Sequence, residues 1–309
     1  MKTALVTGGA GFIGSALVRE LVKKGIRVRV YDDFSSGKEE NLKGLDGDIQ
    51  IVRGCITKPA LFKAMEGVDL VFHLAAVASV SRSFSEPFHC HRINLEGSLA
   101  VMESARKVGV GRLVQAVSAA AYGSNTNIPL SESEAPAPLS PYGLHKVGAE
   151  MYAKIYAEEY GLETVSLRFF NVFGPRQDPN GEYAAVVPKF VDRMIRGKRP
   201  IIFGRGTQTR DFVFVEDVAR ALVMASQSDN PKLIGEVVNV AAGRETSLLD
   251  LASAINACMN TDLEPEFQDA RPGDIERSIA DTTKASELMG FEATTGLQEG
   301  LMSIVTDIS

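Results

Sequence analysis

Tyr142 and Lys146 are the pair in this 309-residue chain whose types and spacing most directly suggest chemistry. They stand four positions apart, and residues four apart lie on the same face of a helix. A phenol, with a reference pKa of about 10, is a usable base only where a neighbouring cation stabilises the phenolate. The pair therefore predicts a general base, Tyr142, activated by Lys146. Taken alone, the spacing also fits a tyrosine at a helix start and an exposed lysine.

Ser118 is a second residue that could take part in the same chemistry. It ends an apolar run over residues 113–117 and is followed four residues later by Tyr122. In open α/β sheets the carboxyl ends of the strands face the ligand crevice. A hydroxyl there could pass a proton between Tyr142 and a substrate hydroxyl. Without the Tyr142 and Lys146 pair, a serine at this place would be read as a turn residue.

Gly8, Gly11 and Gly14 form a dinucleotide-binding pattern directly behind the first apolar run. The first glycine permits the tight turn, the second lets the backbone approach a pyrophosphate, and the third lets the helix pack on the sheet. Asp32, at the end of the next run, would accept hydrogen bonds from the adenosine ribose and repel a 2′-phosphate, and Asp33 adds to this repulsion. We therefore predict NAD as the cofactor, with its nicotinium ring assisting Lys146.

Short apolar runs alternate with helical patterns through the first half of the chain. The expected strands cover residues 3–6, 28–31, 51–53, 70–73, 113–118 and 164–167, and the expected helices cover 15–24, 95–107 and 146–160. This alternation predicts a Rossmann-type, doubly wound parallel sheet of the α/β class.

After residue 168 the alternation gives way to a loop-rich run and a helix over about 187–196. Chain that leaves the sheet near its carboxyl edge is where a substrate lobe would lie. The run 211–226 and the strand 237–240 are expected to return to the main sheet. We therefore predict an NAD-binding domain of residues 1–168, joined by 211–243, and a smaller α/β substrate-binding lobe of residues 169–210 and 244–309.

The composition argues against several other classes of protein. The net charge is −6 and the pI is about 5.4, so nucleic acid is not expected as a partner. Three scattered cysteines and four histidines without ligand spacing indicate a reducing compartment and no metal site. The first strand starts at once and no apolar run is long enough to span a bilayer, so we expect a cytoplasmic protein without a membrane segment.

Seven blocks of residues together resemble the extended short-chain dehydrogenases/reductases, and among them the nucleotide-sugar epimerases. The blocks are Gly8xxGly11xxGly14, His73-Leu74-Ala75-Ala76, Asn94, Ser118, Tyr142xxxLys146, Arg168-Phe169-Phe170-Asn171 and Arg271-Pro272-Gly273-Asp274. The resemblance covers essentially the whole chain. It is far more specific than any one motif because seven blocks occur in order.

The resemblance implies a mechanism and a set of ligands. Tyr142 would remove the proton of the sugar 4-hydroxyl while hydride passes from C4 to NAD, and after the 4-keto sugar turns over, hydride would return to its other face. Ser118 would hold the 4-hydroxyl, and Lys146 would bind the nicotinamide ribose. The residues implied as cofactor ligands are Gly8, Gly11, Phe12, Ile13, Gly14, Asp32, Asp33, Ser36, Gly37, Cys55, Ile56, Leu74, Ala75, Ala76, Asn94, Tyr142 and Lys146.

The substrate side of the resemblance favours a UDP-sugar 4-epimerase. A 4,6-dehydratase carries an Asp-Glu pair after the serine and a decarboxylase a Glu, whereas this chain has three alanines there. Uronate epimerases tend to have Thr in place of Asn171. Ser278 stands where a Tyr would exclude an N-acetyl group, which implies a large pocket. The residues implied at the nucleotide sugar are Ala78, Ser79, Asn171, Gln177, Ala185, Val187, Arg210, Arg271, Asp274 and Ser278.

Cys55 departs from the family pattern. The family has an aspartate there that accepts a hydrogen bond from the adenine amine, and this chain reads Gly54-Cys55-Ile56. We therefore expect weakened adenine recognition at this contact.

The function expected from the sequence is inversion of C4 in UDP-N-acetylglucosamine/galactosamine, and of UDP-glucose/galactose, by a homodimer that uses NAD. A UDP-glucose 4-epimerase with little N-acetyl activity is the nearest alternative. Another nucleotide-sugar epimerase or reductase and a non-catalytic dinucleotide sensor are further alternatives. The sensor would be expected to lack Tyr142 or Lys146, and both are present. The helices that would form a dimer carry apolar stripes that suit an internal core equally well.

Overall fold

The computed structural model describes residues 2–179, 185–270 and 275–308. Its main sheet has seven parallel strands in the order β10-β6-β5-β4-β1-β2-β3. These strands are β1 (Thr3–Thr7), β2 (Arg27–Asp32), β3 (Ile49–Arg53), β4 (Leu70–His73), β5 (Arg112–Ser118), β6 (Glu163–Phe169) and β10 (Val237–Val240). The order reverses between β1 and β4, as in a doubly wound sheet, so the predicted fold class is confirmed.

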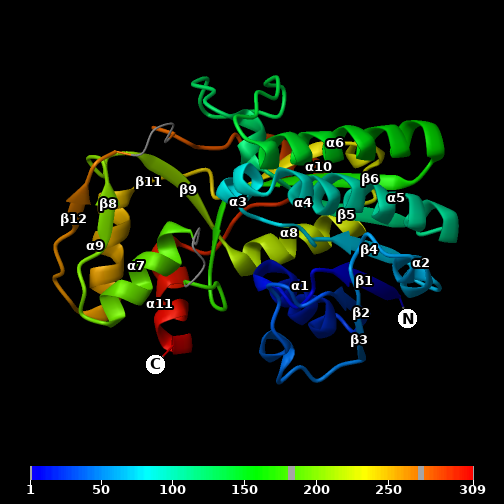
Figure 1. Cartoon of the computed structure of the whole chain (residues 1–309), viewed down its shortest axis with the longest axis horizontal. Helices are drawn as coiled ribbons and strands as arrows, with labels where there is room; N and C mark the ends of the chain where they lie inside the picture. Colours follow the sequence, from blue (N-terminus) through cyan, green and yellow to red (C-terminus); the bar gives the residue numbers. More distant parts are fainter. Residues whose placement is uncertain (1, 180–184, 271–274, 309) are drawn as a thin grey trace.

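Helices cover both faces of this sheet (Figure 1). One face carries α2 (Ala60–Met65), α5 (Gly97–Val108) and α6 (Pro141–Tyr160), and the other carries α1 (Phe12–Lys23), α8 (Val215–Gln227) and α10 (Thr283–Met289). Side chains of β1 alternate between the two layers. Leu5 packs in the cluster of α2 and α5, whereas Ala4 and Val6 pack in the cluster of α1 and α8. Burial on both faces explains why the strands are continuously apolar.

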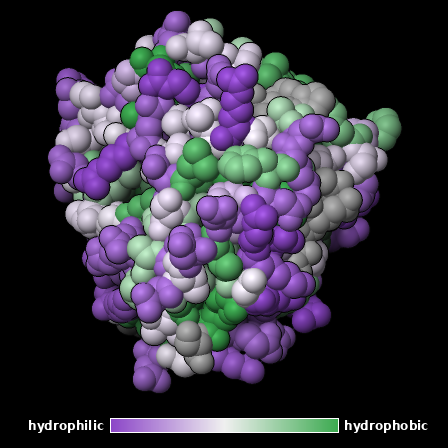
Figure 2. All heavy atoms as spheres, turned by 90° about the vertical axis from the view of Figure 1, so that its left-hand side faces the viewer, coloured by the Kyte–Doolittle hydropathy of each residue, from purple (hydrophilic) through white to green (hydrophobic). Residues whose placement is uncertain are grey.

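The smaller lobe lies at one end of the molecule (Figure 1). It contains a three-stranded sheet of β11 (Glu245–Ser247), β9 (Thr209–Phe214) and β7 (Asn171–Phe173), and a pair formed by β8 (Ile201–Phe203) and β12 (Glu266–Gln268). Its helices are α7 (Val186–Ile195), α9 (Leu248–Met259) and α11 (Leu297–Ile308). Figure 2 shows that its outer face is mostly hydrophilic, with scattered apolar side chains.

Short helices complete the chain between these elements. They are the α-helices α3 (Val80–Ser85) and α4 (Pro87–His91), the π-helix η2 (Arg92–Glu96), and the 3-10 helices η1 (Glu39–Leu42), η3 (Ala119–Tyr122) and η4 (Pro231–Leu233). No helix in the described ranges is both long and apolar enough to cross a membrane.

The expected return of residues 211–226 to the main sheet is only partly right. β9 pairs with β7 and β11 in the separate sheet, while α8 packs on α1 and β10 completes the main sheet beside β6. A second difference concerns α6, which begins at Pro141 rather than at residue 146, because the Ser140 hydroxyl accepts a hydrogen bond from Gly143 N and caps it. Tyr142 therefore lies in the first turn of α6.

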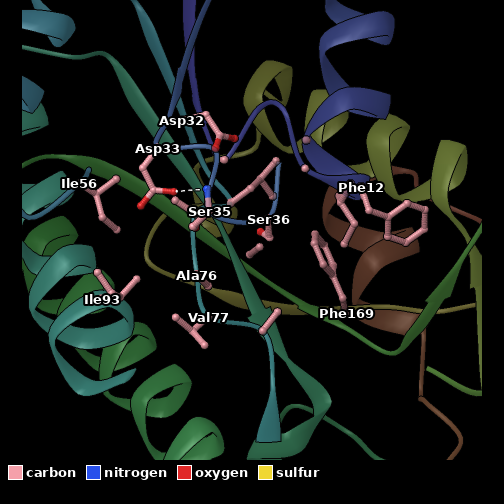
Figure 3. A pocket seen from close by; sticks show the side chains of 18 of the residues that line it. Phe12, Asp32, Asp33, Ser35, Ser36, Ile56, Ala76, Val77, Ile93 and Phe169 are labelled. Atoms are coloured by element: carbon pink, nitrogen blue, oxygen red, sulfur yellow. Dashed lines mark hydrogen bonds between the residues drawn. The ribbon is translucent and has the colours of Figure 1, made fainter. Parts of the chain in front are cut away.

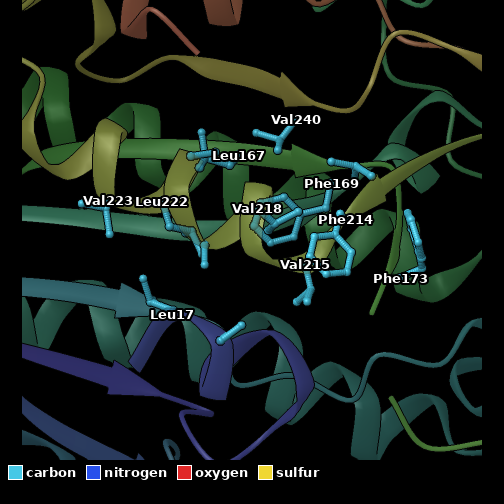
Figure 4. Close-up of a cluster of buried hydrophobic side chains, with 14 of the residues drawn as sticks. Leu17, Leu167, Phe169, Phe173, Phe214, Val215, Val218, Leu222, Val223 and Val240 are labelled. Atoms are coloured by element: carbon cyan, nitrogen blue, oxygen red, sulfur yellow. The ribbon is translucent and has the colours of Figure 1, made fainter. Parts of the chain in front are cut away.

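A single large hydrophobic cluster runs from the main sheet into the smaller lobe. In Figure 4, the α8 side chains Val215, Val218 and Leu222 lie between Leu17 of α1 and Leu167 of β6. The same cluster includes Phe190 of α7, Ile255 of α9 and Leu301 of α11, all at most 3 % exposed. α8 thus connects the two lobes.

Candidate active site

A cavity of about 630 Å³ opens at the carboxyl ends of β1, β2, β4 and β5. Its size is in the range of cofactor and ligand sites. Figure 3 shows Asp32 and Asp33 at one end of the cavity, with Ile56 and Ile93 on one side and Phe12 and Phe169 on the other. The predicted residues that line it are Gly8, Gly11, Phe12, Ile13, Gly14, Asp32, Asp33, Ser36, Cys55, Ile56, Leu74, Ala75, Ala76, Ala78, Ser118, Tyr142, Lys146 and Gln177.

The glycine cradle fits a dinucleotide pyrophosphate. Gly8 has φ +70°, and a Cβ there would lie 2.7 Å from Ala75 N, so only glycine permits this turn. Gly11 is the N-cap of α1, and no side chain in the described chain caps the helix. The N–H groups of the first turn, from Phe12 onward, therefore face the cavity without an internal partner. A phosphate would satisfy them and the helix dipole.

Asp32 is held firmly at the end of β2. Its Oδ2 accepts a hydrogen bond from Ala10 N at 2.9 Å, and its Oδ1 accepts one from Phe34 N at 2.8 Å. Burial raises the pKa of this carboxyl, and the two backbone donors partly offset the rise. An acceptor fixed in the cavity wall suits ribose hydroxyls, as the NAD prediction requires.

Tyr142 and Ser118 meet in the cavity from two elements. Ser118 ends β5 and caps η3, where its hydroxyl accepts a hydrogen bond from Ala120 N at 3.2 Å. The backbone N of Tyr142 donates to Ser83 Oγ at 3.1 Å, which fixes the first turn of α6. Burial raises the pKa of the Tyr142 phenol, and a hydrogen-bonding interaction with Ser118 lowers it only in part. The pKa of Tyr142 is therefore raised, whereas the sequence predicted that Lys146 would lower it.

Lys146 does not offset this rise. Its Nζ donates a hydrogen bond to the Ala116 carbonyl at 2.8 Å and lies 5.9 Å from the centroid of the Tyr142 ring. Burial lowers the pKa of this ammonium to about 8, although Glu150 raises it. The lysine is therefore beside the phenol but directed to the backbone of β5. Activation of Tyr142 requires further positive charge, which the nicotinium ring of a bound dinucleotide would supply.

Two predicted cofactor ligands do not line the cavity. Asn94 uses its side chain on the Val77 backbone, with Oδ1 accepting from N at 2.7 Å and Nδ2 donating to O at 3.0 Å. It therefore positions the wall that follows β4. Gly37 packs closely against Ala10 and Asp32, since a Cβ there would lie 2.9 Å from the Ala10 Cβ and 3.0 Å from Asp32 Oδ1.

Fewer of the predicted sugar-nucleotide ligands than of the predicted cofactor ligands line the cavity. Ala78 and Gln177 line the cavity, and the buried Gln177 Oε1 has no hydrogen-bond partner in the described structure. Ser79 caps α3, Asn171 donates to the Asp211 carbonyl, Ala185 precedes α7 and Arg210 donates to the Ile275 carbonyl. Val187 is 2 % exposed in the core, and Ser278 is 8 % exposed. Arg271 and Asp274 lie outside the described residues.

Arg176 is a cavity residue that the sequence analysis missed. It follows β7, adopts φ +67°, and donates from Nε to Ser15 Oγ of α1 at 3.2 Å. Asp178, two residues on, pairs with Lys38 at 3.4 Å, and both residues line the cavity. Arg82 and His89 also line the cavity. No local motif marks these positions, because the fold brings them to the site from distant segments.

A dinucleotide cradle beside a Ser, Tyr and Lys set on a doubly wound sheet defines an NAD-dependent enzyme of the short-chain dehydrogenase/reductase type. The model of the NAD dependent epimerase/dehydratase family matches residues 4–241. The chain therefore belongs to this family.

Relatives narrow the class further. UDP-glucose 4-epimerase of Mycolicibacterium smegmatis is 39 % identical over 99 % of this chain and 97 % of its own. The solved UDP-N-acetylglucosamine 4-epimerase of Methanobrevibacter ruminantium, in complex with UDP-N-acetylmuramic acid, is 38 % identical with a TM-score of 0.95, covering 99 % and 98 % of the two chains. The solved UDP-glucose 4-epimerase of Thermotoga maritima is 40 % identical with a TM-score of 0.93 and the same coverage. The chain is thus a UDP-sugar 4-epimerase by family, an NAD-dependent isomerase, and these predictions are confirmed.

Proposed function

We propose that this enzyme inverts C4 of UDP-N-acetylglucosamine and UDP-N-acetylgalactosamine, and also accepts UDP-glucose and UDP-galactose. The observation that carries the epimerase chemistry is the meeting of Ser118, Tyr142 and Lys146 in the cavity that also holds the glycine cradle. The reacting carbon of a sugar and a nicotinamide ring could both reach Tyr142 there.

In this mechanism the Tyr142 phenolate removes the proton from the sugar 4-hydroxyl and returns it at the end of the cycle. Ser118 donates to or accepts from the same oxygen, which orients the sugar and relays the proton. Lys146 keeps positive charge next to the phenolate and binds the nicotinamide ribose. The glycine cradle and Asp32 would hold the dinucleotide, which when bound would supply reversible hydride exchange at C4 of the sugar. The net reaction therefore consumes no oxidant.

The proposed tolerance of an N-acetyl group rests on small side chains. Ala78 lines the cavity. Ser278 is a small, buried residue two positions before Ala280, which is bridged to Leu130; it is not among the described residues that line the cavity, and its place in this proposal comes from the sequence resemblance. A roomy sugar site accepts the 2-acetamido group but rejects the smaller hydroxyl only weakly. Relatives named for UDP-glucose and for UDP-N-acetylglucosamine are about equally similar to this chain, which agrees with use of both sugars.

The test is to incubate the purified enzyme separately with UDP-glucose and UDP-N-acetylglucosamine and to identify the products by NMR. We expect the C4 epimer from both sugars. Conversion of UDP-glucose alone would favour the nearest alternative, a UDP-glucose 4-epimerase. Stoichiometric consumption of added NADH would indicate a net reductase, and no conversion of either sugar would favour a dinucleotide sensor.

A homodimer is also proposed, and its support is an exposed apolar stripe on α6. Leu144, Met151 and Ile155 are 59, 60 and 45 % exposed, and their spacing places them on one side of the helix. The inner side of α6 is already buried in the core. Such a stripe is typical of a face covered by a partner. The cytoplasmic location expected from the sequence likewise stays a prediction.

Sedimentation velocity tests the dimer. Met151→Glu should convert dimer to monomer because it places a charge in the interface, whereas Ile195→Glu should not. Ile195 is a similarly exposed apolar residue, 43 % exposed, on the smaller lobe. A monomeric wild-type protein, or a dimer that survives Met151→Glu, would contradict the proposal.

A further inference from the structure

Glu150 and Arg168 form a buried ion pair one helical turn beyond Lys146. Arg168 Nε donates to Glu150 Oε1 at 2.8 Å and Arg168 Nη2 donates to Glu150 Oε2 at 2.7 Å, so the pair is bidentate. The Arg168 side chain is 3 % exposed and the Glu150 side chain is 5 % exposed. Removing two charges from water is costly, and replacement by apolar residues is often neutral or stabilising. This cost indicates a role of the pair other than stabilising the fold.

Arg168 reaches both sides of the catalytic set. Through Glu150 it contacts α6, which carries Tyr142 and Lys146. Its guanidinium also lies over the ring of Tyr122, 4.7 Å from the centroid, in the short helix that follows Ser118. The Tyr122 hydroxyl donates in turn to Asn239 Oδ1 at 2.7 Å. β6 thus anchors the two segments that supply the catalytic residues.

Lys146 is a buried cation whose charge depends on its neighbours. His73 of β4 faces Lys146. Burial, and to a smaller extent the charge of Lys146, lower the pKa of His73 to about 3. Tyr142 and His145 of α6 also face Lys146, and burial lowers the pKa of that histidine too. Both histidines are therefore neutral. β5 offers the Ala116 carbonyl. Among the described groups that act on Lys146, Glu150 is the one with negative charge.

We propose that Glu150, held in place by Arg168, is a positioning residue that keeps Lys146 protonated at the pH where the enzyme works. Lys146 and Glu150 are four residues apart on α6, the spacing at which an acid and a lysine stabilise one another. Arg168 fixes the carboxylate so that it cannot turn toward water. Burial lowers the pKa of Arg168, but the ion pair with Glu150 outweighs this effect and leaves the pKa above its usual value. The guanidinium therefore stays charged. This inference rests on the proposed role of Lys146 as a cation.

The direct test measures the ionisation of Lys146 itself. The full-length, NAD-saturated protein is labelled with 13Cε-lysine and titrated by NMR, and the Lys146 signal is assigned by its loss in Lys146→Arg. In Glu150→Gln the pKa of Lys146 should fall by about one unit or more, because a neighbouring opposite charge typically shifts a pKa by about one to three units. Glu150→Asp keeps the charge and should restore most of the wild-type value.

Two further variants guard against trivial results. Glu150→Gln leaves Arg168 buried without its partner, so the double variant Glu150→Gln/Arg168→Met, which removes both charges, is measured alongside it. The double variant should show a smaller fall in the same direction, because the positive charge of Arg168, which opposes that of Glu150 at Lys146, is removed as well. Glu158→Gln removes the exposed partner of Lys154 on the same helix, a pair 3.7 Å apart, and should leave Lys146 unchanged. An unchanged Lys146 pKa in Glu150→Gln would overturn the inference.

Activity provides a separate readout. If Lys146 must be a cation, the loss of turnover at high pH should move to lower pH in Glu150→Gln by the same amount as the NMR pKa. A fall of the NMR pKa without a change in the pH profile would support the role of Glu150 and contradict the proposed role of Lys146. The two ideas therefore fail in distinguishable ways.

Discussion

Asp211 provides the most quantitative prediction about this protein. It lies in β9 with no exposed surface, and its carboxylate joins three segments. Oδ1 accepts a hydrogen bond from Ala242 N at 2.9 Å, and Oδ2 accepts bonds from Gly243 N at 3.0 Å and Ala280 N at 3.2 Å. The substitution Asp211→Asn keeps the size of the side chain but replaces one acceptor oxygen with a donor nitrogen. At least one buried N–H then faces another donor.

The hydrogen-bond loss destabilises the folded protein by itself. A buried polar group left without its partner costs about 1–3 kcal/mol of stability. The ionisation of Asp211 adds an effect that does depend on pH. Burial raises its pKa from 3.8 to about 6, and the backbone donors only partly offset this rise.

The sign follows from proton binding. Between these two pKa values the folded state holds a proton that the unfolded state has released, so stability falls as pH rises. The contribution is complete below about pH 4 and is lost once pH exceeds about 6. A difference of about two units at about 1.4 kcal/mol each amounts to about 3 kcal/mol. Asparagine does not titrate, so the variant does not lose this stability as the pH rises.

We therefore expect the destabilisation by Asp211→Asn to be largest near pH 4 and to shrink by about 3 kcal/mol by pH 8. Urea unfolding followed by circular dichroism across this range gives the two free energies of unfolding at each pH. Asp229→Asn, at an exposed position, serves as the control. A difference between wild type and Asp211→Asn that stays constant with pH would refute the reasoning.

Three other substitutions test the site. Tyr142→Phe should bind NAD normally in calorimetry and lose about 10²–10⁴-fold in turnover, and near-normal turnover would rule out Tyr142 as the base. Cys55→Asp should tighten NAD binding by about tenfold or more, because a charged hydrogen bond contributes about 1.5–3 kcal/mol; unchanged affinity would mean that another group already meets the adenine amine. Ser278→Tyr should shift the kcat/KM ratio from N-acetylhexosamine toward glucose substrates, and a ratio that does not move would remove Ser278 as the gate.

The fold was largely predictable because each strand of the main sheet carries a local signal. β4 and β10 have the expected bounds, and the other strands differ by one or two residues at their ends. β9 was assigned to the wrong sheet since its apolar run, Phe212 to Phe214, marks a buried strand but not its neighbour. Pairing with β7 depends on contacts about 40 residues away in sequence, which a local pattern does not encode.

The candidate site was predictable to the same extent. The glycine cradle, Asp32, Ser118 and Tyr142 were found because each stands at a fixed distance from a strand end or helix start. Arg176 reaches α1 from 161 residues away and belongs to no local motif. The raised pKa of Tyr142 was missed because burial, and the hydrogen bond of Lys146 to a β5 carbonyl, are properties of the tertiary structure.

The hydrophobic cluster that α8 carries from one lobe into the other limits how this enzyme can be divided. A fragment that ended after β6 would leave Leu17 and Leu167 without the α8 side chains that cover them. We expect both lobes to unfold together in one transition, and a separately expressed NAD-binding fragment to aggregate. Chimaeras that borrow a sugar-binding lobe from a relative would need to take α8 with it, or keep its contact residues, for the graft to fold.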